Sequence, residues 1–273
     1  MNTVTFPAFN LTINIENIAF NIGGVAIYWY AIFITSAIGI AALIFKKRDG
    51  LYGIKFNEIM DLAVLIIPIS IISARFYYII FYDVKYYFEN PIQMLNIRNG
   101  GLAIYGGIIG GIITCVIFCK KRKIDLLNLL DFMAPALALG QAIGRWGNFV
   151  NIEAYGTETK LPWRMGIYEL GEYKEVHPTF LYESIATFIL FSILIMMKDK
   201  RKFKGQITYI YLIGYSFARM LIEGLRADSL MLGKIRISQL LSAIILITAS
   251  VLYMNKTSFN KGGPSQLRWQ PPC

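Results

Sequence analysis

The sequence predicts an all-α integral membrane protein, a bundle of about seven transmembrane helices with a small extracytoplasmic cap and an interfacial arm. Hydrophobic residues fill 56% of the 273 positions and charged residues only 16%, against about 25% charged in a typical soluble domain. The mean hydropathy is +0.51. This small polar surface cannot cover so much apolar mass in water, which excludes a disordered chain and disfavours an ordinary soluble domain.

Seven apolar stretches are long enough, or nearly so, to cross a hydrocarbon core that requires about 20 residues. They cover residues 22–45, 59–81, 101–119, 126–144, 179–197, 206–224 and 236–254. We therefore expect one transmembrane domain over residues 1–256. The sequence changes character after this point, and residues 257–273 are interpreted as a cytoplasmic tail or an expression-vector remnant.

Two segments between the spans exceed ordinary turns. Residues 82–100 are rich in aromatic side chains, which predicts an interfacial arm or an amphipathic helix. Residues 145–178 form the largest insertion, contain Gly, Pro and mixed charge, and are expected to form the extracytoplasmic cap.

The basic residues predict the orientation. Sixteen of the 27 Lys and Arg residues lie in the loops after the first, third and fifth spans and in the tail, and nine at most lie on the opposite side. The positive-inside rule then places the N-terminus outside and the C-terminus in the cytoplasm. The net charge of +10 follows from this topology and from contact with the anionic lipid bilayer, so no nucleic-acid partner is needed to explain it.

Metal and cofactor chemistry is not expected. The three cysteines are too few and too scattered for a disulfide framework, and the single histidine, His177, excludes histidine-rich metal sites. The chain lacks an HExxH motif, an aspartate-rich metal box and a Walker loop. Intramembrane proteolysis and metal-assisted phosphotransfer are therefore disfavoured.

The first candidate site is the run GRWGNFVNIE at the exit of the fourth span. A spacing of three places Arg145, Asn148 and Asn151 on one helical face, and flanking glycines leave room for a lipid headgroup. A charge at membrane depth costs about 2.5–3.5 kcal/mol, so it needs a partner or a task. Arginine matches a phosphate through its planar fork. The alternative is a structural ion pair between Arg145 and Glu153.

The second candidate site is in the sixth span. The spacings 4, 4 and 3 place Tyr215, Arg219, Glu223 and Arg226 on one stripe of a helix that rises towards the outer interface. The alternative is a purely structural pair of Arg219 with Glu223, which would lower the cost of holding either charge in lipid.

Three further positions stand out. The run GGLAIYGG at residues 100–107 surrounds Tyr105 with glycines, which indicates close backbone approach, an unwound helix start or simple packing through small residues. Arg75 adds another cation within a span. His177 precedes the fifth span, where a hydrogen-bonded structural role is the more typical alternative to a base, and Glu183 is expected to face inward.

These motifs resemble those of the prolipoprotein diacylglyceryl transferase family of bacterial membranes. The run GRWGNFVNIEAYG, residues 144–156, fits the family signature Gly-Arg-x-Gly-Asn-Phe-x-Asn-x-Glu-x-x-Gly at every defined position. GGLAIYGG, HPTFLYE and the tyrosine–arginine–glutamate–arginine stripe support the match. The resemblance extends over about residues 28–242, most of the chain.

The resemblance implies an enzyme, with residues 1–256 as its single transmembrane catalytic domain. The implied reaction transfers the sn-1,2-diacylglyceryl group from phosphatidylglycerol to the lipobox cysteine thiol of a prolipoprotein signal peptide. The products are a thioether and glycerol 1-phosphate, and the reaction is the first step of bacterial lipoprotein maturation. The implied location is the bacterial cell membrane, with the active site towards the outer leaflet.

The resemblance and the residue patterns together give the expected site. The expected catalytic residues are Arg145, Arg219 and Tyr105. The expected substrate-binding residues are Arg145, Asn148, Asn151, Glu153, Gly156, Tyr30, Arg75, Tyr215, Glu223, Arg226 and His177. Many family members carry His at the position of Tyr105, so a positioning role is expected for this tyrosine, and the proton acceptor stays open between Tyr105, His177 and another group.

Two other classes of protein are alternatives for this sequence. A secondary transporter of an anionic solute could use the same buried arginines, but inverted repeats and paired broken spans would be expected and neither is visible in the sequence. A seven-span scaffold or binding protein is the weaker alternative.

Overall fold

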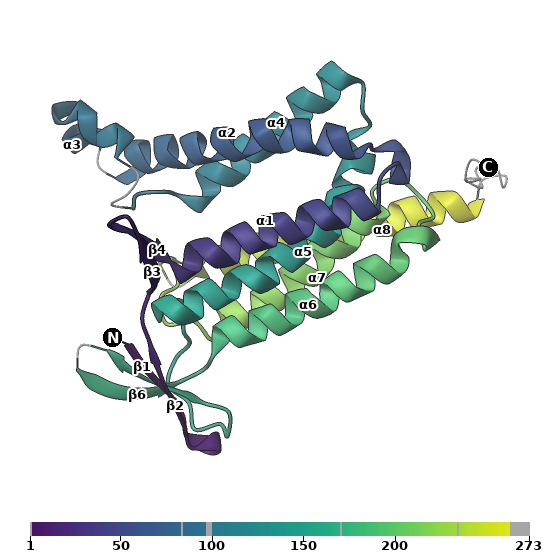
Figure 1. Ribbon diagram of the computed structural model, residues 1–273. Coiled ribbons are helices and arrows are strands. Elements are labelled where there is room, and N and C mark those ends of the chain that lie inside the picture. Colours follow the sequence, from purple (N-terminus) through teal and green to yellow (C-terminus); the bar gives the residue numbers. More distant parts are fainter. Residues whose placement is uncertain (1, 83, 97–99, 170, 234, 263–273) are drawn as a thin grey trace. The chain divides into compact units, whose positions relative to one another are not determined.

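The computed structural model describes residues 2–82, 84–96, 100–169, 171–233 and 235–262 (Figure 1). The chain divides into two compact units. Unit one comprises Met1–Ile44 and Met133–Cys273, and unit two comprises Phe45–Phe132. A single catalytic domain over residues 1–256 stays a prediction. Residues 257–262 of the expected tail are part of the last helix, and residues 263–273 lie outside the described residues.

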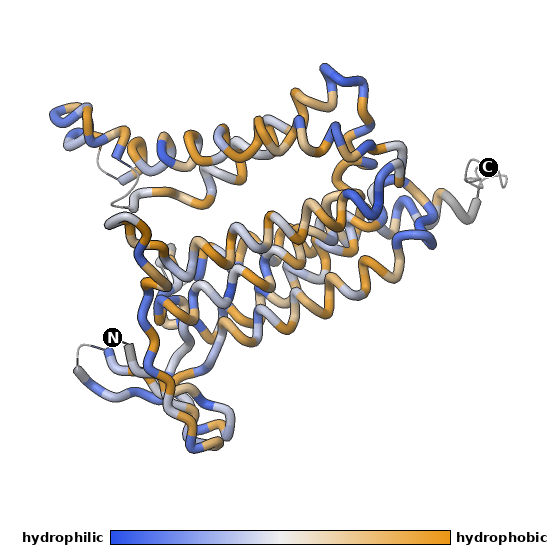
Figure 2. Tube along the Cα trace, in the orientation of Figure 1, coloured by the Kyte–Doolittle hydropathy of each residue, from blue (hydrophilic) through white to orange (hydrophobic). Residues whose placement is uncertain are grey.

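The mostly helical membrane fold is confirmed. Six helices within the described residues are long and apolar enough to cross a membrane. They are α1 (Trp29–Lys47), α2 (Phe56–Tyr82), α4 (Ile104–Arg122), α5 (Leu126–Asn151), α6 (Thr179–Met197) and α8 (Ile237–Gly262). Figure 2 shows apolar residues along the middle of these helices and hydrophilic residues near their ends.

The sixth expected span, residues 206–224, forms the helix α7 (Gln206–Glu223), which packs against α6 and α8. This helix is less apolar than the other six because it carries Gln206, Arg219 and Glu223. A span at residues 206–224 therefore stays a prediction, since polar side chains at membrane depth require partners.

The first span begins later than expected. Residues 22–28 are not helical, since β3 (Ile18–Ile22) and β4 (Val25–Tyr28) form a hairpin before α1. Its turn contains Gly23 and Gly24, with φ of 55° and 82°, a conformation that glycine adopts without steric cost. The prediction of a helix over residues 22–28 was wrong because this glycine pair ends the apolar run as a turn.

The cap contains a four-stranded antiparallel sheet that an all-α prediction did not include. The strands are β1 (Asn2–Phe6), β2 (Leu11–Ile15), β5 (Met165–Glu169) and β6 (Glu172–Val176), in the order β2-β1-β5-β6. A short helix, η1 (Pro7–Phe9), joins β1 to β2. The core of this cap sheet is formed by Val4, Ile15, Met165, Ile167 and Val176, together with Val150 of α5 and Phe180 of α6. The cap sheet therefore lies at the ends of α5 and α6 (Figure 1).

The helices of unit one share a second core. It contains Ala134 and Ala138 of α5, Leu190 and Leu194 of α6, and Ile207 of α7. A Cβ at Gly214 of α7 would meet Leu190 at 2.8 Å, so α6 and α7 are in close contact there. The remaining short elements are η4 (Lys198–Lys200) and the hairpin of β7 (Met231–Leu232) and β8 (Ile235–Arg236).

In unit two, glycines bring α4 against α2. A Cβ at Gly106 would lie 2.5 Å from the carbonyl oxygen of Ser73, and one at Gly110 would lie 2.3 Å from the Ser73 hydroxyl. These two glycines therefore serve helix packing. The expected arm contains α3 (Val84–Glu89) and η3 (Pro91–Leu95), and it exposes Phe88, Ile92 and Leu95. The turn before α2 contains η2 (Leu51–Gly53).

Candidate active site

The first sequence motif lies on the last turns of α5, because this helix continues beyond the expected exit at residue 144 to Asn151. Arg145 Nη1 donates a hydrogen bond to Asn148 Oδ1 at 3.0 Å. The amide nitrogens of Asn148 and Asn151 lie 2.8 and 3.5 Å from Glu153 Oε1. Glu153 therefore holds the two amides and does not pair with Arg145, in contrast to the alternative considered for this motif.

The partner of Arg145 is Glu183, on the first turns of α6. Arg145 Nη2 donates to Glu183 Oε1, and Arg219 Nη1 donates to Glu183 Oε2 at 2.9 Å. One carboxylate from α6 thus joins a guanidinium from α5 to a guanidinium from α7. Arg145 and Arg219 are called the arginine pair below.

A second carboxylate holds Arg219 from its own helix. Arg219 Nη2 lies 2.7 Å from Glu223 Oε2, an ion pair outside hydrogen-bond geometry. The exposed fractions of the side chains are 20% for Arg145 and 14% for Arg219, but only 3% for Glu183 and 2% for Glu223. Glu183 and Glu223 are thus more deeply buried than the arginines that they hold, and the guanidinium groups are the more accessible members of these ion pairs.

The stripe predicted on α7 is only partly correct. Tyr215, Arg219 and Glu223 are on the helix, but α7 ends at Glu223 and Arg226 lies beyond it. Arg226 instead forms two hydrogen bonds with Asp228, of 2.9 and 2.8 Å. Burial alone would raise the pKa of Asp228, but the hydrogen bonds from Arg226 hold it below its usual value. Gly224 ends the helix, which separates Arg226 from the stripe.

Gly156 and His177 meet where the cap joins the helices. The amide of Gly156 donates to the carbonyl oxygen of His177 at 2.9 Å, and a Cβ at Gly156 would lie 2.6 Å from the Cβ of His177. No larger residue fits there without displacing the backbone. His177 Nδ1 lies 3.2 Å from the hydroxyl of Tyr182, and burial lowers the pKa of His177.

Tyr30, the second residue of α1, packs on α5 between the site residues. A Cβ at Gly147 would lie 2.4 Å from a ring carbon of Tyr30. The glycine therefore allows the aromatic ring to approach the turn that carries Arg145 and Asn148.

Arg75 and Tyr105 belong to unit two. The five N–H groups of Arg75 all donate to main-chain oxygens, those of Gln93, Met94, Asn96, Gly100 and Gly101. This geometry favours a role in holding the chain at residues 93–96 and 100–101, and direct binding of substrate by Arg75 stays a prediction. Tyr105 is the second residue of α4 and is half-buried, and its approach to the arginine pair also stays a prediction.

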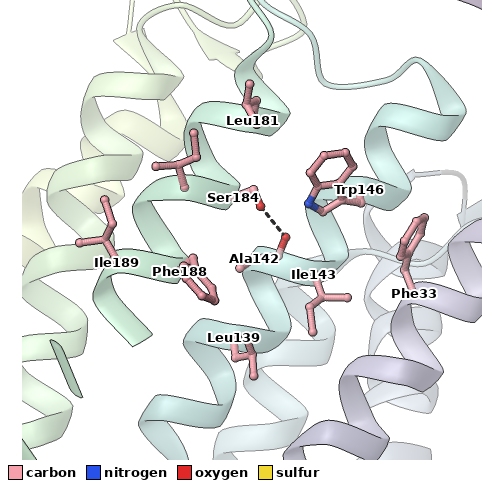
Figure 3. Close-up of a pocket in the computed structure, with 10 residues that line it drawn as sticks. Phe33, Leu139, Ala142, Ile143, Trp146, Leu181, Ser184, Phe188 and Ile189 are labelled. Carbon is pink, nitrogen blue, oxygen red and sulfur yellow. Dashed lines mark hydrogen bonds between the residues drawn. The ribbon is translucent and has the colours of Figure 1, made fainter. Parts of the chain in front are cut away.

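An apolar pocket of about 520 Å³ lies between α1, α5 and α6 in unit one (Figure 3). Phe33, Ile143, Trp146, Leu181 and Phe188 are among its lining residues. The hydroxyl of Ser184 in the pocket wall donates to the carbonyl oxygen of Ala142 at 2.9 Å and is therefore satisfied. Trp146 and Ser184 directly follow Arg145 and Glu183 in the sequence, but consecutive residues of a helix face different directions, so the pocket and the charged network lie on different faces of α5 and α6.

Glu183 is the residue that the expected site omitted. The sequence indicated only that it faces inward, without assigning it a role. The available signal was a carboxylate within an apolar span, because such a charge requires a partner. The sequence did not say which of the arginines that partner would be.

Comparisons with known proteins agree with the motifs. The family model described as Prolipoprotein diacylglyceryl transferase matches residues 17–255. A phosphatidylglycerol–prolipoprotein diacylglyceryl transferase of Finegoldia magna is 47% identical over 238 residues, which cover 87% of this chain and 94% of the relative. Relatives with the same name from Clostridioides difficile and Bacillus cereus are 41% and 40% identical, and they cover 92% and 88% of this chain and 99% and 91% of their own lengths. The transporter alternative finds no support in these matches.

Proposed function

The chain belongs to the prolipoprotein diacylglyceryl transferase family, and we propose that it transfers the sn-1,2-diacylglyceryl group of phosphatidylglycerol to the lipobox cysteine of a prolipoprotein. The family match over most of the chain supports the reaction. The arginine pair is the observation that carries the site, because it presents two partly exposed guanidinium groups side by side on one buried carboxylate.

The reaction requires a site that binds the phosphate group of the lipid as the negative charge on this group increases. The cysteine sulfur forms a bond to the glyceryl carbon, the bond from that carbon to the phosphate oxygen breaks, and the thiol proton leaves. The released glycerol phosphate carries one more negative charge than the phosphodiester did. Arg145 and Arg219 would bind this phosphate more tightly as its charge grows, and such differential binding lowers the barrier.

The residues around the pair have proposed roles in binding. Asn148 and Asn151, held by Glu153, would contact the headgroup oxygens, and Glu223 would orient Arg219. Tyr30, Gly156 and Tyr215 would shape the site. Arg75, Tyr105, His177 and Arg226 are retained as proposed contributors to substrate binding or positioning, and the proton acceptor remains open.

The apolar pocket fits the other part of the same substrate. Its lining is almost entirely hydrocarbon, which suits a lipid tail and offers nothing to a headgroup. We therefore propose that an acyl chain of a lipid substrate occupies this pocket.

The chain is a multi-pass membrane protein, and we propose the bacterial cell membrane as its location. Within unit one, Arg145, Glu183 and Glu223 lie at the helix ends next to the cap sheet, whereas Lys198 and Lys200 lie at the opposite end of α6. Basic residues mark the cytoplasmic side. This supports an active site towards the outer leaflet, with the N-terminus outside and the C-terminus in the cytoplasm.

The test is direct conversion of a substrate. The purified protein is reconstituted in phosphatidylglycerol vesicles with a lipobox peptide, and the peptide mass is followed by mass spectrometry. A gain of one diacylglyceryl group is expected, with none for a peptide in which serine replaces the cysteine or for vesicles without phosphatidylglycerol. An unmodified peptide in the complete reaction would overturn the proposal.

A further inference from the structure

Glu183 occupies an unusual position between three helices. Its carboxylate accepts one hydrogen bond per oxygen, from Arg145 of α5 and from Arg219 of α7. Its side chain is 3% exposed, so the carboxylate is withdrawn from water, whereas the two arginine side chains are 20% and 14% exposed. Burial of this kind is costly, and a buried ion pair adds little stability over apolar side chains of similar volume. Stability alone therefore does not account for a carboxylate at this point.

The surrounding contacts fix Glu183 in place. The next residue, Ser184, is hydrogen-bonded to the carbonyl oxygen of Ala142 on α5. One turn later, Thr187 donates to the carbonyl oxygen of Glu183 at 2.7 Å. Because α6 is tied to α5 beside the carboxylate and packs closely on α7, the positions of both guanidinium groups depend on this one side chain.

The geometry of the carboxylate resembles that of the ligand proposed for the pair. A carboxylate and a phosphate each present two oxygens on one central atom. Arginines that bind the two oxygens of Glu183 are therefore already close enough together to share a second anion of similar shape. Without Glu183, none of the contacts given above among the described residues would join the two cations: Arg145 would keep Asn148, Arg219 would keep Glu223, and mutual repulsion would favour their separation.

We propose that Glu183 is a positioning residue for the transfer reaction. It aligns Arg145 and Arg219 as a pair, so that both bind the same phosphate through their remaining N–H groups. The inference rests on the proposed function, because it gives the arginine pair a phosphate to bind. Glu183 acts through the arginines and takes no part in bond formation or cleavage.

A double-mutant cycle tests this role. Glu183→Gln keeps the shape but removes the charge, and it should lower kcat by about 10- to 100-fold, since a displacement of about 1 Å at a reacting centre costs on the order of 10²-fold. KM for phosphatidylglycerol should change much less. In an Arg219→Ala background there is no pair left to align, so adding Glu183→Gln should cost less than about threefold more.

Two further variants complete the design. Glu175→Gln is the matched control, because Glu175 also accepts a hydrogen bond from an arginine, Arg164, at 2.5 Å, but within the cap. It should retain normal turnover. Glu183→Asp should recover part of the lost rate. If Glu183→Gln does not yield folded protein, as judged by gel filtration, Glu183→Asp takes its place in the cycle.

The outcomes separate the two proposals. Normal turnover in Glu183→Gln, or a full multiplicative loss when it is combined with Arg219→Ala, would overturn the positioning role. In the second case Glu183 would act independently of Arg219. Normal turnover in both Arg145→Ala and Arg219→Ala would instead overturn the role of the arginine pair itself.

Discussion

Two regions of this protein hold arginine within the membrane-spanning part of the chain, and they do so in different ways. In unit two, Arg75 is 7% exposed and gives all five of its N–H groups to main-chain oxygens, with its guanidinium 5.1 Å from the centre of the Tyr87 ring. In unit one, Arg145 and Arg219 are held by carboxylates and stay partly exposed. Arg75 thus holds the main chain around it, whereas Arg145 and Arg219 are held in place by carboxylate side chains.

The difference shows how a buried arginine can be interpreted. A guanidinium surrounded by carbonyl oxygens has its donors occupied, so it contributes to the fold. A guanidinium held by a more deeply buried carboxylate has its charge offset and its direction fixed, and its remaining donors are available to a ligand. Sequence alone places Arg75 and Arg145 in the same class, and only their partners separate them.

The largest expected effect is on the arginine pair. Arg145→Ala should lower turnover of a lipobox peptide by about 10²–10³-fold, the common cost of removing one donor from a developing anion. Its unfolding free energy should fall by only about 1 kcal/mol, because Glu183 keeps Arg219 as a partner. Turnover by mass spectrometry and thermal unfolding in detergent measure the two quantities.

The control is Arg122→Ala, which removes an exposed ion pair with Asp61 in unit two. Such pairs contribute little, so both turnover and stability should be retained. Equal losses of turnover in the two variants would remove the distinction between the regions.

The next effect should appear in unit two. Arg75→Lys replaces five donors in a planar fork with three on a single ammonium, so main-chain oxygens lose their partners. Each buried acceptor left without a partner costs about 1–3 kcal/mol. Hydrogen exchange should therefore become faster in peptides covering residues 91–96 and 100–103, but not in α6.

A different result would contradict the assignment of Arg75 to the fold. If Arg75 bound the headgroup directly, the lysine variant would raise KM for phosphatidylglycerol and leave hydrogen exchange in those peptides unchanged.

The comparison also extends to how helices are joined. In unit two, α2 and α4 meet through glycine, whereas in unit one a carboxylate links α5, α6 and α7. Gly106→Ala should lower the unfolding free energy by about 1–3 kcal/mol, because the added methyl group overlaps the backbone of α2. Gly39→Ala in α1 is the matched control, since nothing lies within 4 Å of its Cβ position. A similar loss in both variants would show that backbone contact is not what the glycine permits.

The smallest effect concerns His177, which lies beside the hydroxyl of Tyr182 and not beside a carboxylate. Burial lowers its pKa from the usual 6.5, so the folded state favours the neutral ring. Its contribution to stability is therefore complete above that value and is lost as the pH falls through the lowered pKa of the folded state. Thermal unfolding between about pH 5 and 7 should depend less on pH in His177→Asn than in the unmodified protein. An unchanged pH dependence would contradict this assignment.

Local sequence patterns were sufficient for most of the helices. The α6 helix occupies the same residues, 179–197, that its apolar run predicts, because a span of this length has few alternatives in a membrane. Hydropathy alone mispredicts residues 22–28, because Gly23 and Gly24 favour a turn within this apolar run. Arg226 was misplaced for a related reason, since the helical spacing was continued past Gly224.

Contacts between distant residues were beyond the reach of such patterns. The alternation in β1 and β2 was a local signal for strands, but the pairing of Val4 with Ile167 joins segments that no periodicity connects. The sequence predicts that the charges of Arg145 and Arg219 are costly within a membrane. Their shared partner, Glu183, lies on a third helix, and this contact depends on how α5, α6 and α7 pack.

The pairing of β1 with β5 also constrains how the chain is threaded through the bilayer. Among the helices that the structure describes, four candidate spans, α1, α2, α4 and α5, separate these two strands. An even number of crossings returns the polypeptide to the face from which it started, as hydrogen-bonded neighbours in one sheet require. The backbone pairing in the sheet and the lysines and arginines of the loops therefore predict the same parity for the proposed topology.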